Sequence, residues 1–423
     1  MLSPRALALL AVAALASAIS PPPAAAKRTI RMRVPSFVVQ PHTDREVCTF
    51  VPVPMKEQFN FQKSVVVNVG GDKHFTTHHF LAWVYTGTSV DGFPKRGEIV
   101  DSKACLDFGP DPNARTLIAG AQAVKLVTTF GEGLAQQLTP TASGSGKQVL
   151  GIILNSHWIN SGDKPKRAAV KLTLVAAKPH TVRRFVLPIF EVTANAYIGV
   201  APGQQSSEHC YWGPGSAKFG QGTSIGGGSV PDKNATACVV GITSHMHKRG
   251  VLFTVDLVKS TPTRPVNTLC FTPPNEEVLS ADLLRTTQYT DPPQVSLMGN
   301  GGGMAIHPGE FLRYTCTHDN TGADAQRPVK MGCEVTPGVA PGASIFSLVL
   351  KGLTFDEATR QAAARRCSSD ADCAGFGTGK CVPANLAFGF TSDDDMCIMP
   401  GGYYDADTSG NCDVMSFPVE PNG

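Results

Sequence analysis

Charged and aromatic residues are both scarce in this 423-residue sequence. Lys, Arg, Asp and Glu together make up 17% of it, aromatic residues make up 7%, and the formal net charge is only +3. A net charge this close to zero gives no reason to expect nucleic acid or an anionic membrane as a partner. We therefore expect a small-molecule substrate, with no nucleic acid and no membrane bound. The composition does not indicate an oligomeric state.

Long apolar segments are absent beyond the N-terminus. Arg5 precedes an apolar run over residues 6–19, and the small residues Ala24, Ala25 and Ala26 follow that run. This order is typical of a secretory signal peptide, and the run is too short to span a bilayer comfortably. An N-terminal membrane anchor is the alternative interpretation. We predict a signal peptide over residues 1–26 and a secreted or periplasmic protein.

Close cysteine pairs of the form C-x-x-C are absent, although the chain contains 12 Cys. Zinc sites built from cysteine use such pairs, whereas an even number of cysteines in an exported chain indicates disulfides. Cys367, Cys373 and Cys381 lie in a stretch rich in Asp, Gly and Ser. This stretch predicts a small loop region held by disulfides.

Glycine and proline are abundant, with 42 and 32 residues, and they separate short apolar runs. That texture is typical of many short strands joined by turns. It predicts an all-β protein of two antiparallel, jelly-roll-like β-sandwich domains, over residues 27–188 and 189–423. We interpret residues from about 320 to 388 as a Cys-rich insertion in the second domain. A capping pattern predicts a helix over residues 355–366 within the insertion.

Two pairs of histidines are the first candidate metal ligands. His245 and His247 alternate in a predicted strand over residues 239–247, so their side chains share one face and can hold one metal. Imidazole suits Cu, Zn, Fe and Ni, although a solvated strand face is the alternative. His78 and His79 are adjacent in the chain. Adjacent strand residues bind one metal only at a bulge, a twist or a strand end.

Two single residues complete the candidate set. His157 follows Asn155 on the same predicted strand face, where the amide could orient a ligand ring. Met396 follows three aspartates and precedes Cys397. A thioether is a soft ligand that favours Cu(I) over Zn, although most methionines fill cores. Met399 and Met246 are rival thioethers.

In this order, these pieces resemble the copper type II, ascorbate-dependent monooxygenases, the family of peptidylglycine α-hydroxylating monooxygenase and dopamine β-monooxygenase. The order also includes Val34-Pro35 before Cys48 and Tyr403-Tyr404 after Cys397. The resemblance implies two coppers per chain. The first would be held by His78, His79 and His157, and the second, which is the catalytic one, by His245, His247 and Met396.

The family resemblance also implies a reaction. Ascorbate reduces copper, dioxygen binds at the methionine-containing copper, and a substrate C–H bond is hydroxylated there. The peptide enzymes of the family hold a substrate carboxylate with an Arg two residues before the H-x-H pair, and Thr243 stands at that position here. Arg is the natural bidentate clamp for a carboxylate. We therefore expect a neutral or weakly polar substrate in apolar contact near Phe80, Met399 and Tyr403.

The resemblance further implies the disulfides Cys48–Cys105, Cys316–Cys397 and Cys210–Cys412. Cys238–Cys270 rests only on two neighbouring predicted strands, and the pairing of Cys333, Cys367, Cys373 and Cys381 stays open because four cysteines allow three connectivities. Two other functions remain in view. One is a non-catalytic copper-binding or copper-handling protein, and the other is a carbohydrate- or surface-binding β-sandwich with incidental histidines.

Overall fold

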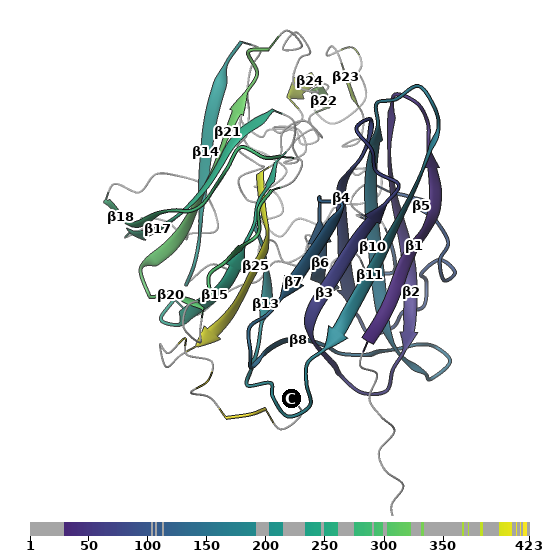
Figure 1. Cartoon of the computed structure of the whole chain (residues 1–423), viewed down its shortest axis with the longest axis horizontal. Helices are drawn as coiled ribbons and strands as arrows, with labels where there is room; N and C mark the ends of the chain where they lie inside the picture. The colour runs from purple at the N-terminus through teal and green to yellow at the C-terminus, as the bar shows by residue number, and fades with distance from the viewer. Residues whose placement is uncertain are drawn as a thin grey trace, which may run out of the picture.

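Four large β-sheets make up most of the described part of the protein, whose structure is a computed structural model. They form two units that lie side by side (Figure 1). This confirms the prediction of an all-β fold with antiparallel sheets. Within the residues described, no helix is long and apolar enough to cross a membrane. The structure describes residues 29–102, 105, 108–111, 114–191, 203–214, 233–246, 249–260, 275–289, 292–298, 303–322, 331–333, 366–367, 371, 381–383, 397–407, 412, 415 and 418–420.

The first unit contains two six-stranded sheets, and their strands are antiparallel apart from the short β8–β12 pairing. Sheet I has the order β1-β11-β3-β8-β12, with β7 also paired to β3: β1 (Thr29–Val39), β11 (Lys166–Ala176), β3 (Phe59–Val69), β8 (Leu134–Leu138), β12 (Arg184–Phe185) and β7 (Lys125–Thr129). Sheet II has the order β5-β2-β10-β4-β6, with β9 paired to β10: β5 (Val100–Asp101), β2 (Thr43–Pro54), β10 (Gln148–Asn160), β4 (Phe75–Tyr85), β6 (Arg115–Ala121) and β9 (Thr141–Ala142).

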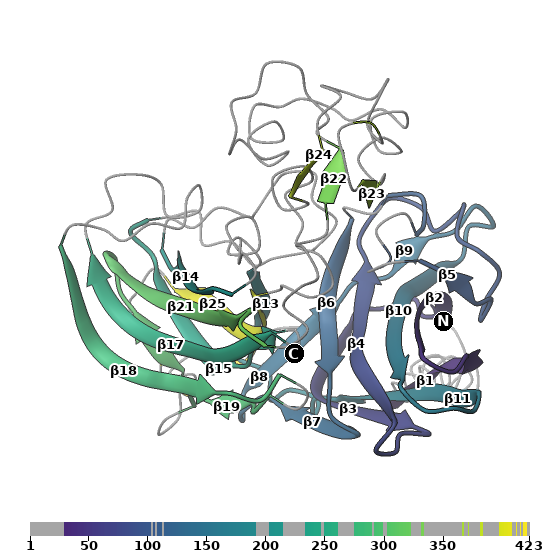
Figure 2. The ribbon, with the colours of Figure 1, turned by 90° about the horizontal axis from the view of Figure 1, so that it is seen from above.

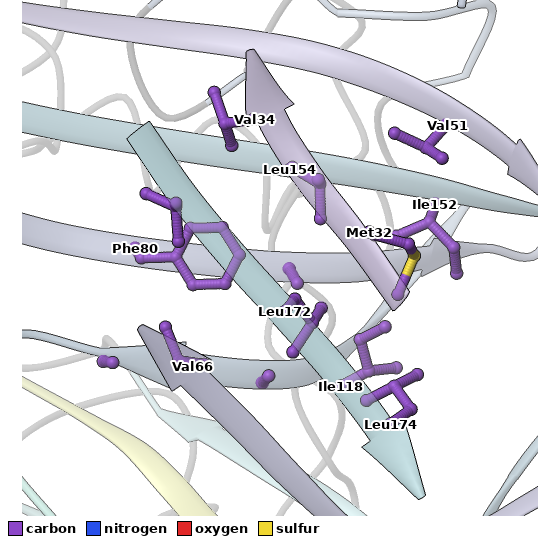
Figure 3. Close-up of a cluster of buried hydrophobic side chains, with 14 of the residues drawn as sticks. Met32, Val34, Val51, Val66, Phe80, Ile118, Ile152, Leu154, Leu172 and Leu174 are labelled. Atoms are coloured by element: carbon purple, nitrogen blue, oxygen red, sulfur yellow. The ribbon is translucent and has the colours of Figure 1, made fainter. Parts of the chain in front are cut away.

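Period-two alternation places the core between sheets I and II. In β1, Ile30, Met32 and Val34 are buried, whereas Arg31 and Arg33 between them are exposed. These aliphatic side chains pack against residues of sheet II such as those labelled in Figure 3. Burying such a side chain is worth about 1.5–3 kcal/mol, so the alternation fixes which face of each strand turns inward.

The central strand β10 is buried on both faces, as its nearly continuous apolar sequence suggests. Its second face carries Val149 and Ile153, which join a separate apolar cluster with residues from the connection after β4. The disulfide Cys48–Cys105 ties that connection to β2, and it confirms the predicted pair. The outer face of sheet II is therefore covered at one end, and it carries polar residues at the other.

The second unit also has two packed sheets. Sheet III has the order β13-β25-β15-β19, with β16 paired to β25 and β20 paired to β15: β13 (Leu187–Glu191), β25 (Cys397–Asp407), β15 (Thr236–Ile242), β19 (Val295–Ser296), β16 (His245–Met246) and β20 (Met304–Ile306). Sheet IV has the order β14-β21-β17-β18: β14 (Gln205–Trp212), β21 (Glu310–Asp319), β17 (Gly250–Ser260) and β18 (Glu276–Thr286). A shared apolar core joins the two sheets.

Apolar packing and hydrogen bonds connect the two units. Val240 of β15 belongs to the buried cluster of the first unit, and Met298 packs against that cluster. Gln122 Nε2 donates to the carbonyl oxygen of Tyr289 at 2.9 Å. These contacts bring sheet III against the first unit, where β13 and β25 lie beside β6 (Figure 2).

A small three-stranded sheet falls within the predicted insertion. It has the order β23-β22-β24: β23 (Arg366–Cys367), β22 (Met331–Cys333) and β24 (Cys381–Pro383). The predicted helix over residues 355–366 lies outside the described residues except for Arg366, which is in β23. Of the four cysteines left open, Cys333, Cys367 and Cys381 lie in this sheet, and Cys373 lies outside the described residues.

One disulfide of the second unit differs from the prediction. Cys412 pairs with Cys238 across a Cα–Cα distance of 5.5 Å, so the predicted pairs Cys210–Cys412 and Cys238–Cys270 are wrong. The cause is strand order. Cys412 follows β25, and β25 lies next to the strand that carries Cys238, whereas Cys210 lies in sheet IV. Cys210 and Cys316 are each disulfide-bonded, and the pair Cys316–Cys397 stays a prediction.

Candidate metal centre

One row of residues across sheet II forms the base of the site. His157 in β10 pairs with Glu46 in β2 on one side and with His79 in β4 on the other. Residues directly opposite one another in an antiparallel sheet project from the same face. The row therefore sets a carboxylate and two imidazoles side by side, at the polar end of the outer face of sheet II.

A β-bulge brings His78 into this row. Thr77 pairs with Trp158 and His79 pairs with His157, so β4 has one more residue than β10 between these two pairs. His78 is one of those two residues, and a bulge re-aims a side chain in this way. Its ring centroid lies 5.2 Å from that of His79 and 4.9 Å from that of His157. The bulge meets the condition under which adjacent histidines can share a metal.

Carboxylates fix the orientation of two of the rings. His79 Nε2 lies 3.1 Å from Glu46 Oε1 and 2.8 Å from Asn155 Oδ1, and both oxygens are acceptors. His157 Nε2 lies 2.8 Å from Asp44 Oδ2. Each Nε2 therefore donates a hydrogen bond, and in the uncharged form of either ring the Nδ1 lone pair is left for another partner. This carboxylate–imidazole pairing is the usual outer support of a metal-bound histidine.

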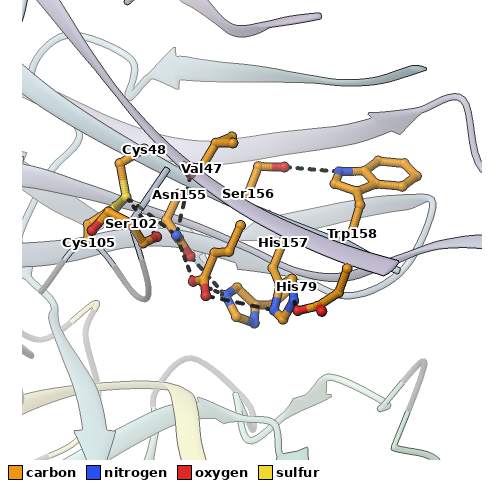
Figure 4. A network of polar contacts seen from close by, with 11 residues as sticks. Val47, Cys48, His79, Ser102, Cys105, Asn155, Ser156, His157 and Trp158 are labelled. Atoms are coloured by element: carbon orange, nitrogen blue, oxygen red, sulfur yellow. Dashed lines mark hydrogen bonds and ion pairs between the residues drawn. A yellow bond between two sulfur atoms is a disulfide. The ribbon is translucent and has the colours of Figure 1, made fainter. Parts of the chain in front are cut away.

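Asn155 links the His79–Glu46 pair to the disulfide between Cys48 and Cys105 (Figure 4). Its Nδ2 donates to Glu46 Oε1 at 2.9 Å, and it also lies 3.7 Å from Cys48 Sγ of the Cys48–Cys105 disulfide. The predicted role of Asn155 as a supporting partner is therefore changed in one respect. Its side chain holds His79 on the neighbouring strand rather than His157 on its own strand.

The second unit contributes His245 to the same place. Its ring centroid lies 5.4 Å from that of His78 and 5.7 Å from that of His79, and only 6% of the residue is exposed. His245 begins β16, which pairs with the start of β25: His245 lies opposite Ile398, and Met246 lies opposite Cys397. Four of the six predicted ligands thus meet where the two units touch.

Burial and charge set the protonation of two groups here. Burial alone would raise the pKa of Glu46, but the hydrogen bond from His79 and the charges of His79 and His157 lower it to about 2. Burial lowers the pKa of His245 to about 3, and the neighbouring imidazoles act in the same direction. The carboxylate is therefore ionised at neutral pH, and the His245 ring is neutral, the form in which an imidazole nitrogen can bind a metal.

The donor atoms fit a transition metal. One ligand atom from each of His78, His79 and His245 lies within 4.8 Å of the others, and the same holds for Glu46, His79 and His157. His79 Nδ1 is buried and has no hydrogen-bond partner in the described part of the chain. An unpartnered buried nitrogen is costly unless a ligand or metal takes its lone pair. Imidazole nitrogens suit copper and zinc, and an added carboxylate also suits iron.

The other predicted site residues lie in the sequence just before β25, just after β16 or between β15 and β16. His247 and Met396 lie outside the described residues, so their assignment to a second copper stays a prediction. The predicted single strand over residues 239–247 divides into β15 and β16, which both pair with β25 but at different ends of it. Thr243 lies between them, and its Oγ1 donates to the carbonyl oxygen of Pro293 at 2.9 Å.

Phe80 does not line the site, contrary to the expectation. It is fully buried in the core between sheets I and II (Figure 3), whereas His79 lies on the outer face of sheet II. The neighbouring strand residue must alternate to the other face once the bulge has passed. A substrate near the histidines cannot reach Phe80. Met399 and Tyr403 lie in β25, and nothing about their side chains is described.

Sequence reasoning missed Glu46 and Asp44. Both lie in β2 on the face that carries Cys48, at alternate positions. Acidic residues two and four positions before a disulfide cysteine gave a usable signal, because alternation places all three side chains on one face. Nothing in a single sequence, however, shows which strand lies beside β10.

Comparisons with known proteins add no family. No family model matches the chain, and no curated protein matches it. Among solved structures, one of Broad Bean Stain Virus covers 65% of this chain and 83% of its own, with 10% identity and a TM-score of 0.28. One of infectious bursal disease virus, Gx strain, covers 70% of this chain and 67% of its own, with 8% identity and a TM-score of 0.14. Scores this low support no functional argument.

Proposed function

We propose that this chain is a secreted copper-dependent monooxygenase that hydroxylates a C–H bond of a small organic substrate with O₂ and ascorbate or another one-electron reductant. The observation that carries the proposal is the cluster of four imidazoles with the buried, unpartnered Nδ1 of His79. The order of motifs that resembles the copper type II monooxygenases supports the choice of copper. The paired disulfides support an oxidising compartment, where secreted proteins fold.

The predicted ligands would form two separate copper sites. His78, His79 and His157 would hold one copper, with Glu46 and Asp44 orienting two of the rings through their Nε2 atoms. His245, His247 and Met396 would hold the second copper. The register supports a link between these last two residues, because Cys397, which follows Met396, pairs with Met246, which precedes His247.

Copper, when bound, would supply one-electron redox chemistry and a place for O₂. The overall reaction balances when the substrate C–H and O₂ take two electrons and two protons to give a C–OH and water. The chain would contribute positioning and a site shielded from bulk water, since His245 and His157 are both buried. Exclusion of water protects a reactive centre from side reactions.

Copper reconstitution and O₂ uptake test the proposal. Protein stripped of metal and reloaded with Cu(II) is expected to retain two coppers per chain after dialysis, and to consume O₂ with ascorbate only when a suitable substrate is present. Retention of copper without ascorbate-dependent turnover of any substrate in a broad panel would favour the second candidate, a copper-binding or copper-handling protein. Retention of no copper would refute both.

A further inference from the structure

The six strands of sheet I contain no acidic residue. They contain eight basic residues and no Asp or Glu in any of β1, β3, β7, β8, β11 and β12. The whole chain, by contrast, has 37 basic and 34 acidic residues. The small net charge therefore conceals a strong local separation of charge.

Strand register gathers most of these cations on one face. Arg33 pairs with Lys171, Lys171 pairs with Val67, and Val67 pairs with Lys125, which makes one row across four strands. Directly opposed residues project from the same side of a sheet. Alternation adds the remaining cations to this side. The basic face consists of Arg31, Arg33, Lys63, Lys125, Arg167 and Lys171.

The basic face is open and its charges are uncompensated. Arg31, Arg33, Lys125, Arg167 and Lys171 are all exposed, and Lys63 is half-buried. In the described part of the chain, no ion pair or side-chain hydrogen bond engages any of the six, whereas Lys166 on the same strand pairs with Asp72 at 2.7 Å. Six like charges at strand spacing repel one another, so the face carries a positive potential toward solvent.

Aliphatic side chains occupy the space between the cations. Val65 and Val67 lie in the same rows, and Val69 and Val127 are 38% and 42% exposed. Val124, at the turn before β7, is 66% exposed. No aromatic, amide or carboxylate side chain shares these rows. The face thus offers charge and apolar surface but no aromatic ring on which bases could stack.

We propose that the basic face of sheet I docks the protein onto an anionic lipid surface. Clustered Lys and Arg residues are attracted to anionic headgroups, and exposed valines between them add apolar contact with the interface. Single-stranded nucleic acid is less well matched, because its binding depends on aromatic stacking. The expectation of no membrane partner rested on net charge alone, which the separation of charge makes uninformative.

Docking through sheet I would leave the metal centre free. Sheets I and II pack face to face, so their outer faces point in opposite directions. The histidine cluster lies on the outer face of sheet II and at the contact with the second unit. A small substrate could therefore reach the cluster from the aqueous side while the protein is held at the membrane. This proposal is independent of the metal bound.

Vesicle sedimentation tests the docking surface. The full chain is mixed with vesicles of phosphatidylcholine alone or with one-third phosphatidylglycerol, at low salt and at about 0.5 M salt. The double variant Arg33→Glu/Lys171→Glu reverses two charges in the central row. The matched control Lys147→Glu/Lys233→Glu changes net charge equally at exposed positions outside sheet I. Circular dichroism and thermal melts check that both variants fold like the parent.

We expect binding to the anionic vesicles only, with a loss of at least tenfold at high salt. The face variant should bind at least about 20-fold more weakly, because each cation near an anionic surface is worth about fivefold in affinity. The control should stay within about threefold of the parent. No binding by the parent, equal binding to neutral vesicles, or an equal loss in the control would overturn the proposal. Binding to heparin or DNA that depends on the face, without vesicle binding, would assign the face to a polyanion and also overturn it.

Discussion

His79 lies directly opposite His157 across β4 and β10, one residue after a bulge that places His78 beside both. Glu46 continues the row on the far side of His157. The sheet itself therefore positions three imidazoles and a carboxylate, and a rigid element holds a site more accurately than a loop does. The predictions below follow from this row and from the ring that the second unit adds.

Replacing either opposed histidine should abolish metal binding at the three-histidine site. His79→Ala removes a ring whose Nδ1 has no other partner in the described structure, and His157→Ala removes the centre of the row. We expect the copper content after dialysis to fall from two to one in each variant. His74→Ala is the matched control, because His74 is exposed just before the same strand. A parent-like copper content in His157→Ala would contradict the assignment.

The charge of Glu46 should strengthen metal binding through His79. Glu46→Gln keeps an oxygen acceptor for His79 Nε2 but removes the negative charge that makes the imidazole a better donor. We expect about 10–100-fold weaker copper affinity, the usual effect of losing such an outer partner, as measured by competition with a chelator. Glu57→Gln at an exposed position should leave the affinity unchanged. Unchanged affinity in Glu46→Gln would show that the carboxylate is only structural.

The metal-free protein should lose stability as the pH falls. The pKa of His245 is lowered from 6.5 to about 3. Below about pH 6.5, this histidine is therefore protonated in the unfolded chain but still neutral in the folded chain. The pKa of Glu46 is lowered from 4.5 to about 2, which adds a second loss below about pH 4.5. Both shifts have the same sign, because in each window the unfolded state binds more protons.

Urea unfolding at several pH values measures this effect. Between about pH 7 and about pH 5, His245 alone should reduce the free energy of unfolding by about 2 kcal/mol. His245→Gln has no titrating ring and should flatten the dependence by that amount, while His74→Ala should not. An equal slope in the parent and in His245→Gln would rule out the buried neutral ring as its cause.

Much of the fold follows from local pattern, and the site follows only in part. The alternation in β1 and the apolar run of β10 are local signals, so these strands could be placed from the sequence. The bulge at His78 could be stated only as a condition, because it depends on the register against β10. The contact of His245 with His78, the pairing of Cys238 with Cys412 and the burial of Phe80 each depend on which elements become neighbours. A single sequence does not show directly which elements, far apart along the chain, become neighbours in the fold.

The bridge between Cys316 and Cys397 stays a prediction with a direct test. Cys316 is disulfide-bonded, and Cys397 begins β25 beside Met246. Peptide mapping under non-reducing conditions should find the two cysteines joined. The bridge would anchor the chain next to Met396, so Cys316→Ser should weaken copper at the methionine-containing site and spare the three-histidine site. A free Cys397, or another partner for it, would contradict the predicted bridge.

The substrate should not be a glycine-extended peptide. Thr243 stands where the peptide enzymes of the resembling family hold a terminal carboxylate with Arg, and its hydroxyl already donates to the carbonyl oxygen of Pro293. Loss of a desolvated, charge-assisted pair costs about 2–5 kcal/mol, which is roughly a 30- to several-thousand-fold loss in affinity or rate. Burial of Phe80 removes one expected apolar contact, so any apolar pocket must come from the second unit.

Turnover with ascorbate and O₂ compares the two substrate classes directly. A panel of small neutral aromatic compounds should be hydroxylated at rates well above a glycine-extended peptide. The peptide's C-terminal amide, which carries no carboxylate, should react no more slowly than the acid, because Thr243 makes no use of that charge. Efficient hydroxylation of the acid alone would mean that another cation takes the place of the missing Arg. Arg249 is the candidate to replace in that event, since it is buried and follows the H-x-H segment by two residues.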